Sequence, residues 1–459
     1  MSTPPITREL ARFAVGLKYE DIPADAVAKA KHCILDQLGV ELVGSTLDWN
    51  KIALRYVARM DGRAESTIVN HGIRALALDA AFVNATFGQG CELDDVGFGA
   101  GGHPSAATVP VALALSETEK VSGRDFIAAV VAGWDVMYRL LLSVRPSAAR
   151  RGFHSHGIGG PFGAAVVAGR LLGLSEAEML NAFGITGSHC GGSVEYDQTG
   201  GEVKRVHGGM VARAGIQSAM LAQLGLTGPP TIIEGLRGFC RVFADEYDLD
   251  VIARELGGDF KIRNVWFKMH PCVATVQGTI DVLADLKQEH GFRADEVREI
   301  RVGISETSVK HGGAIYEPHD VASAQFSLPF SLALRLVKDD NSLSKYMDAS
   351  LWRDQTVLNI AHKVKPHAVP EAKGQLNYLT LMEVDLADGS TVAKRQDYPR
   401  GCPRNPVTTQ VLQDKFRRLA GEVLPDDRLD RIIAQVEHLE DAADASDMVP
   451  LLVRDGAKA

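Results

Sequence analysis

Residues 124–144 read RDFIAAVVAGWDVMYRLLLSV, and their apolar side chains recur three and four positions apart. This spacing is typical of an α-helix that packs against a core. Similar periodicity runs from Ile6 to about Gly257, and Ser175 with Glu178 fits a capping box at the start of one helix. No alternating strand pattern of convincing length occurs in this region, so the sequence predicts a compact α-helical domain.

The pattern changes after Asp259. Residues 296–305 (EVREIRVGIS) alternate as a strand does, and so do residues 376–398 around Asp388-Gly389, which is a strong hairpin signal. Helical spacing occurs at 273–287 and 323–337. Helices mixed with antiparallel strands predict a smaller α+β domain.

Helical periodicity returns beyond Pro403 and Pro406, and we expect this tail to rejoin the first domain. The predicted fold is mainly α with an α+β lid. A discontinuous all-helical domain comprises residues 1–264 and 406–459, and the smaller α+β domain, residues 265–405, is inserted into it.

The composition is that of an ordinary globular protein, with 46% hydrophobic and 23% charged residues among 459. The net charge is −9 and no basic block is present, so nucleic acid is not an expected partner. The uncharged stretches 96–116 and 152–169 are broken by Gly, Pro and His, so we expect no membrane span. The N-terminus has no apolar signal-peptide core and the six cysteines are widely spaced, so we expect a reduced, cytoplasmic protein.

Glycine is concentrated in one part of the chain. Of the 45 glycines, 28 lie between Gly88 and Gly238. A local excess of this kind indicates turns and close backbone approach beside a pocket.

The first candidate motif in this region is CELDD, residues 91–95, followed by glycines and His103-Pro104-Ser105. Three carboxylates within four residues repel one another, so one is expected to have a raised pKa or a cation beside it. His103 precedes an expected helix start at Pro104, and a helix N-terminus favours anionic ligands. A solvated acidic loop is the competing interpretation.

The second motif is GFHSHG, residues 152–157, which leads toward a helix rich in small residues. His154 and His156 have no third metal ligand at suitable spacing, so metal binding is the minor hypothesis. A general acid–base role for one imidazole is more economical, because its pKa lies near neutrality. Two histidines hydrogen-bonded to the backbone are the alternative.

Two further motifs carry cations. In GGEVKRVHGG, residues 200–209, Lys204 and Arg205 precede a helix expected over residues 210–224, which would make a carboxylate-binding corner. KMHPC, residues 268–272, lies at the expected seam between the domains, where small-molecule sites are common. Solvated, purely connecting segments are the competing interpretation of both.

Taken in this order, the motifs resemble those of the MmgE/PrpD family, whose members include 2-methylcitrate dehydratase, cis-aconitate decarboxylase and iminodisuccinate epimerase. The resemblance covers nearly the whole chain. Besides the four motifs it includes EDIPADAVAKAKHCILDQLGVELVGS at 20–45, IIEGLRGF at 232–239, AQFSLPF at 324–330 and YPRGCPRNPV at 398–407.

The resemblance implies a homodimeric enzyme without metal or cofactor that acts on small di- or tricarboxylates. It implies proton removal next to a carboxylate, followed by loss of water or carbon dioxide or by reprotonation. The expected catalytic residues are His103, His154, Lys204, Glu92 and Asp94, and the expected substrate-binding residues are Arg205, Lys268, His156, His270, Gln277 and Ser105. His154 is the leading base and His103 the leading acid, although the two roles could be exchanged. Glu92 or Asp94 is expected to orient one imidazole.

Two positions depart from the family pattern. Val96 stands where the family has a threonine, and Gln277 stands where dehydratases and decarboxylases carry a histidine. An amide cannot transfer a proton, so His270 or His156 is a candidate replacement. Three hypotheses therefore follow: a lyase, an epimerase that needs only proton removal and return, and a non-catalytic carboxylate-binding protein.

Overall fold

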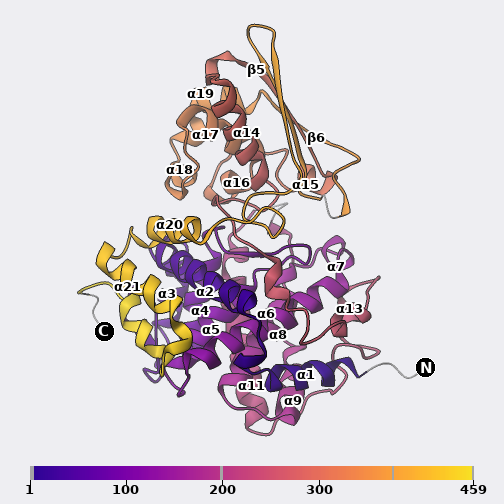
Figure 1. Ribbon diagram of the computed structural model, residues 1–459, viewed down its shortest axis with the longest axis vertical. Coiled ribbons are helices and arrows are strands. Elements are labelled where there is room, and N and C mark those ends of the chain that lie inside the picture. Colours follow the sequence, from indigo (N-terminus) through magenta and orange to yellow (C-terminus); the bar gives the residue numbers. More distant parts are fainter. Residues whose placement is uncertain (1–4, 197–199, 375–376, 457–459) are drawn as a thin grey trace. The chain divides into compact units, whose positions relative to one another are not determined.

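The computed structural model describes residues 5–196, 200–374 and 377–456 (Figure 1). The chain forms two compact units. The described residues of the first unit fall within 1–196, 202–266 and 408–459, and those of the second fall within 197–201 and 267–407. The prediction of a mainly helical protein with a small α+β domain is confirmed. The sequence put the two main boundaries after residues 264 and 405, whereas in the structure they follow residues 266 and 407.

The first unit is built almost entirely of helices. Its longer helices are α1 (Ile6–Gly16), α2 (Ala24–Gly44), α4 (Ala77–Gln89), α5 (Pro104–Ser116), α6 (Gly123–Val144), α8 (Ser155–Leu171), α9 (Glu176–Thr186), α11 (Val203–Gln223), α20 (Thr409–Ala420) and α21 (Asp426–Glu437). Short helices and strands complete it: α3 (Lys51–Val57), α7 (Ser147–Arg150), α12 (Phe239–Phe243), α13 (Asp250–Ala253), β1 (Ser66–Thr67), β2 (Arg74–Ala75), β3 (Val96–Gly97) and β4 (Val265–Trp266).

Helix α6 lies at the core of this unit. Ser122 caps it, because the Ser122 hydroxyl accepts a hydrogen bond from the Asp125 N–H at 3.1 Å. Among the described helices, α6 is the one long and apolar enough to cross a membrane, and 94% of its most apolar window is buried inside the protein. The capping box predicted at Ser175 and Glu178 is present at the start of α9.

The C-terminal helices return to the first unit as expected. Helix α20 packs on α2, and α21 contacts both of them (Figure 1). Both helices are amphipathic, with buried apolar residues at three- and four-residue spacing, for example Leu412, Phe416 and Leu419 in α20.

The glycines of this region serve both close backbone approach and turns, as predicted. Many of these glycines lie inside helices, where α11 packs closely on α8 and α4. A Cβ atom at Gly215 would come within 2.3 Å of Ala164 Cβ, and one at Gly209 within 2.4 Å of the Phe82 carbonyl oxygen. Glycine therefore serves close helix packing at these positions and turns at others, where Gly101 and Gly102 before His103 and Gly200 and Gly201 before α11 have positive φ.

The second unit contains a four-stranded sheet in the order β6-β5-β7-β8. Its strands are β5 (Val297–Ile304), β6 (Val364–Ala368), β7 (Thr380–Leu386) and β8 (Thr391–Gln396), and its helices are α14 (Gln277–His290), α15 (Glu306–Lys310), α16 (Val321–Gln325), α17 (Leu328–Lys338), α18 (Leu343–Met347) and α19 (Gln355–Ala361). Strands β5 and β6 are parallel, and the other two pairings are antiparallel. The predicted strand at 296–305 and the hairpin at Asp388-Gly389 are confirmed, while Leu376 lies outside the described residues.

One predicted helix, 323–337, is instead two helices. The helix is interrupted at Phe326-Ser327. The Ser327 hydroxyl accepts a hydrogen bond from the Phe330 N–H at 3.0 Å at the start of α17. Since a serine followed two residues later by a proline is a strong helix start, Ser327 and Pro329 favour a new helix over continuation.

Candidate active site

The acidic segment and the first histidine lie together in the helical unit. The His103 ring Nδ1 is 2.8 Å from the backbone oxygen of Asp95 and 3.1 Å from a carboxylate oxygen of Asp94. Both neighbours are acceptors, so Nδ1 carries the hydrogen and Nε2 is the nitrogen through which this imidazole can exchange a proton. Of the two carboxylates expected to orient an imidazole, Asp94 is the one beside His103.

Asp95 holds the start of the helix that follows His103. Helix α5 begins at Pro104 as predicted, but the His103 side chain does not cap it. The Asp95 carboxylate takes that place, because it accepts hydrogen bonds from the Ser105 N–H at 3.1 Å and from the Ser105 hydroxyl. Burial is the main cause that raises the pKa of Asp95 to about 6. Ser105, predicted to bind substrate, thus contacts Asp95.

His156 supports His103 from α8. Its Nδ1 accepts a hydrogen bond from the His103 backbone N–H at 3.3 Å, which assigns the ring hydrogen to Nε2. The side chain is fully buried, and within the described part of the chain its Nε2 has no hydrogen-bond partner. Burial, with smaller contributions from His103 and His207, lowers the pKa of His156 well below its usual value. His156 is therefore a neutral donor.

His154 precedes α8 and contacts a histidine that the sequence did not single out. Its Nδ1 lies 2.7 Å from Nδ1 of His207, and the two ring centroids are 4.9 Å apart. The His154 backbone N–H donates to the Gly192 carbonyl at 2.9 Å. Burial, followed by the nearby Lys204 ammonium, lowers the pKa of His207 to about 4. His103, His154, His156 and His207 thus form one group, which we call the histidine cluster.

Lys204 and Glu92 form a buried ion pair next to this cluster. Glu92 has φ of 60°, in the left-handed region that costs a non-glycine residue about 1–3 kcal/mol. Such strain persists where the surrounding structure enforces it, which is common at functional sites. Glu92, the other carboxylate expected to orient an imidazole, therefore faces a cation.

The prediction that Lys204 and Arg205 precede their helix is wrong. Helix α11 starts at Val203, seven residues earlier than predicted, so both cations lie in its first turn. This position is unfavourable for positive charge, but tertiary contacts override it. The Arg205 guanidinium donates to the Gly90 carbonyl at 2.6 Å and lies 4.3 Å from the centre of the Trp49 ring.

A buried lysine from the C-terminal region supports the acidic segment. Lys415, on α20, lies 2.7 Å from the Asp36 carboxylate and donates to the Leu93 backbone oxygen at 2.9 Å. Leu93 stands between Glu92 and Asp94, so Lys415 anchors the segment that carries both. No local sequence signal links Lys415 to residues more than three hundred positions away.

The remaining predicted residues lie in the second unit. The Gln277 side-chain oxygen accepts the backbone N–H groups of Met269 and His270 at 3.0 Å, and its nitrogen donates to the backbone oxygens of His270 and Cys272. Gln277 therefore holds the KMHPC loop in shape. The His270 ring lies 3.0 Å from the Asp281 carboxylate, and Lys268 is buried.

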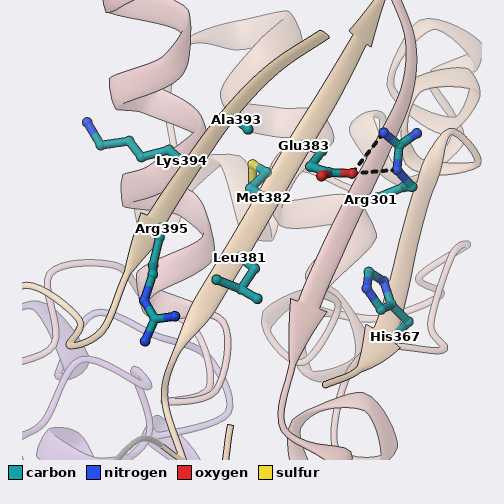
Figure 2. Close-up of a pocket in the computed structure, with 8 residues that line it drawn as sticks. All are labelled: Arg301, His367, Leu381, Met382, Glu383, Ala393, Lys394 and Arg395. Carbon is teal, nitrogen blue, oxygen red and sulfur yellow. Dashed lines mark hydrogen bonds and ion pairs between the residues drawn. The ribbon is translucent and has the colours of Figure 1, made fainter. Parts of the chain in front are cut away.

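A pocket of about 350 Å³ lies on the open face of the sheet (Figure 2). Figure 2 shows Arg301 on β5 facing Glu383 on β7, with 2.9 Å between their charged groups. The other cations that line this pocket, Lys394 and Arg395, also have carboxylate partners. Because these cations are already paired with carboxylates, the pocket has little positive charge left to bind an anionic ligand.

Metal ligation finds no support in the described residues. They contain no group of three or more His, Cys, Asp or Glu side chains arranged to hold a metal ion. No disulfide joins the six cysteines, all of which fall within the described ranges.

The residues missed by sequence reasoning are the partners of those it found. His207, Asp95, Trp49 and Lys415 each contact a predicted site residue or its segment. His207 follows Lys204 by three residues, and the two share a helix face only because α11 starts at Val203, which the sequence did not predict.

Fold and site together define a mainly helical protein with an inserted α+β unit and a buried acid–base cluster in its helical part. Comparison with known proteins identifies the group more closely. The MmgE/PrpD N-terminal domain matches residues 8–252 and the MmgE/PrpD C-terminal domain matches residues 270–441. The chain belongs to the MmgE/PrpD family.

Several relatives are similar over 97% of this chain. A cis-aconitate decarboxylase-like protein, oryM, from Aspergillus oryzae is 30% identical over 97% of its own length. The cis-aconitate decarboxylases of Aspergillus terreus and Homo sapiens are 27% and 28% identical over 96% and 94% of their lengths.

Proposed function

We propose that this protein is a lyase that acts on a small di- or tricarboxylate, with decarboxylation of cis-aconitate as the first reaction to test. Dehydration of a 2-methylcitrate-like substrate is the other lyase reaction. The family membership and the names of its relatives support a lyase of this kind. The observation that carries the proposal is the histidine cluster, which lies beside a buried Lys204–Glu92 pair in one unit.

Carboxylate binding in this proposal depends on cations. A buried carboxylate requires a charged or hydrogen-bonding partner to offset its desolvation. We assign this role to Lys204 and Arg205. Lys268, which the sequence predicts to bind substrate, lies in the second unit, and its role stays a prediction. Because Glu92 neutralises Lys204 in the structure, an incoming carboxylate competes with Glu92 for the ammonium.

Proton transfer in this proposal belongs to His103 and His154. Loss of carbon dioxide leaves the electron pair of the broken C–C bond on the substrate as a carbanion conjugated with a carboxylate, and a protonated imidazole then supplies the proton. Loss of water instead begins when a neutral imidazole removes the proton next to a carboxylate. Asp94 keeps the His103 hydrogen on Nδ1, so His103 exchanges protons through Nε2 in either reaction.

The test is to incubate the purified protein with a panel of di- and tricarboxylates in deuterated water. Loss of the mass of carbon dioxide, with one solvent deuterium in the product, supports decarboxylation, and loss of the mass of water supports dehydration. Deuterium uptake without mass loss indicates an epimerase, which Gln277 favours because an amide bonded to backbone on both sides transfers no proton. No change with any substrate favours a carboxylate-binding protein and contradicts the proposal.

The resemblance to the family also supports three proposals about the working state: a homodimer, no cofactor, and a cytoplasmic location. Light scattering, turnover after dialysis against a chelator, and fractionation of cells that produce the protein test them.

A further inference from the structure

The contact between His154 and His207 restricts where protons can sit. Two imidazole nitrogens 2.7 Å apart form a hydrogen bond only if one carries a hydrogen and the other a lone pair. A doubly protonated His207 could only donate its Nδ1 hydrogen and could not accept one. Burial and the Lys204 ammonium disfavour that state, so His207 is neutral.

The role of His154 determines the direction of this hydrogen bond. Since its Nδ1 is engaged with His207, the nitrogen through which it can exchange a proton with a substrate is Nε2. When His154 is a base, Nε2 holds a lone pair and Nδ1 holds the hydrogen. When it is the conjugate acid, both nitrogens hold hydrogens. In both states Nδ1 is a donor, and the nitrogen that faces it must accept.

We infer that His207 is a positioning residue that accepts the Nδ1 hydrogen of His154 and so keeps the Nε2 of His154 as the proton-transferring atom. This inference rests on the proposed role of His154. It assigns His207 the neutral form with its hydrogen on Nε2, a form that stays the same throughout a proton transfer at His154.

The surrounding backbone fits this role. Gly192 has φ of 104°, and a Cβ atom there would lie 3.2–3.6 Å from atoms of the His207 ring. The carbonyl of the same residue accepts the His154 N–H. Because Gly192 has no side chain, the His207 ring can lie against it while its carbonyl accepts the His154 N–H.

The groups that face the pair come from each neighbouring element. His103 precedes α5 and His156 lies on α8, with ring centroids 6.2 and 6.1 Å from that of His154. The Tyr196 ring is 5.9 Å from His154 and 6.2 Å from His207. Lys204, one turn before His207 on α11, is the nearby cation, and Glu92 is its partner. The hydrogen-bonded neighbour at Nδ1 of His154 that carries the inference is His207, at 2.7 Å.

Two substitutions at His207 distinguish the loss of the hydrogen-bond acceptor from the loss of the ring itself. His207→Asn keeps an oxygen near the position of Nδ1, whereas His207→Leu keeps volume and removes the acceptor. In the leucine variant we expect kcat to fall by about 10–100-fold, the usual scale for loss of an orienting partner, with KM little changed. The limb of the pH profile that reports His154, the acid limb when it is the base and the alkaline limb when it is the acid, should also move to lower pH, because the acceptor stabilises the imidazolium form of His154. The asparagine variant should retain most of the rate, and His438→Asn, at a side chain 76% exposed on the surface, is the control.

Nitrogen NMR of the ¹⁵N-histidine-labelled protein tests the inference without turnover, with the His154 signals assigned from a His154→Gln variant. We expect hydrogen on Nδ1 of His154 in the wild type and in His207→Asn, and a shift toward Nε2 in His207→Leu. Hydrogen on Nε2 of neutral His154 in the wild type, or an unchanged tautomer in His207→Leu, would overturn the inference. If His154→Ala turns over normally while the tautomers are as expected, the proposed function fails and the assignment of the hydrogen bond stands.

Discussion

Asp95→Asn should make the helical unit more stable at neutral pH. The Asp95 carboxylate is 1% exposed, and burial raises its pKa from 3.8 to about 6. A raised folded-state pKa means that the stabilising contribution is fully present below pH 3.8 and is lost as the pH rises through 6. The difference of about 2.2 pKa units corresponds to about 3 kcal/mol.

The asparagine side chain has nearly the same shape and does not ionise. Its oxygen can accept from the Ser105 N–H, and the Ser105 hydroxyl can rotate to accept from its nitrogen, so the start of α5 keeps both contacts. We expect the difference in free energy of unfolding, variant minus wild type, to increase by about 2.5 kcal/mol between pH 4 and pH 7. Most of the change should occur between pH 4 and 6.

The assay is equilibrium urea unfolding followed by helical circular dichroism at several pH values. Asp48→Asn is the matched control, because the Asp48 side chain is 95% exposed, and its difference from wild type should stay nearly constant. A constant difference for Asp95→Asn over the same range would refute the view that this carboxylate is buried at a free-energy cost.

Three further predictions concern the support of the site and its chemistry. Lys415→Met should destabilise the protein by about 3–5 kcal/mol, because it leaves a buried carboxylate beside an apolar side chain, and adding Asp36→Asn should restore most of the loss in urea unfolding. Gly215→Ala should cost about 1–3 kcal/mol through overpacking against Ala164, whereas Gly16→Ala, which meets nothing within 4 Å, should not lower the thermal midpoint. His103→Asn, which keeps a donor toward Asp94 but transfers no proton, should lower kcat by about 10²–10⁴-fold at an unchanged thermal midpoint, and wild-type turnover would contradict its role.

The fold class was predictable because its signals are local and periodic. Helical spacing over 124–144 and alternation over 296–305 each report which side chains face a core, and both became the expected elements. The start of α11 was not predictable from the same rule. Two cations in a first turn oppose the helix dipole, and Lys204 is held there by Glu92, 112 residues away.

The sequence predicts which motifs contribute to the candidate site. It does not predict which of their side chains contact one another. Asp94 and His103 are close in the chain, so their contact follows from one turn. His154 and His207 lie 53 residues apart and meet only because α8, α11 and the segment around Gly192 pack together. Contacts of this kind depend on tertiary packing, which periodicity does not encode.

In the proposed reaction, imidazoles of the helical unit transfer the proton while a small di- or tricarboxylate loses carbon dioxide or water. The most direct test is kcat of wild type and His154→Ala on whichever di- or tricarboxylate the wild type consumes, measured in deuterated water with thermal unfolding as the fold control. We predict a decrease of at least about 10²-fold in a folded variant, with solvent deuterium in the wild-type product if carbon dioxide is lost. A folded His154→Ala variant that retains the wild-type kcat would contradict the role of His154 in proton transfer.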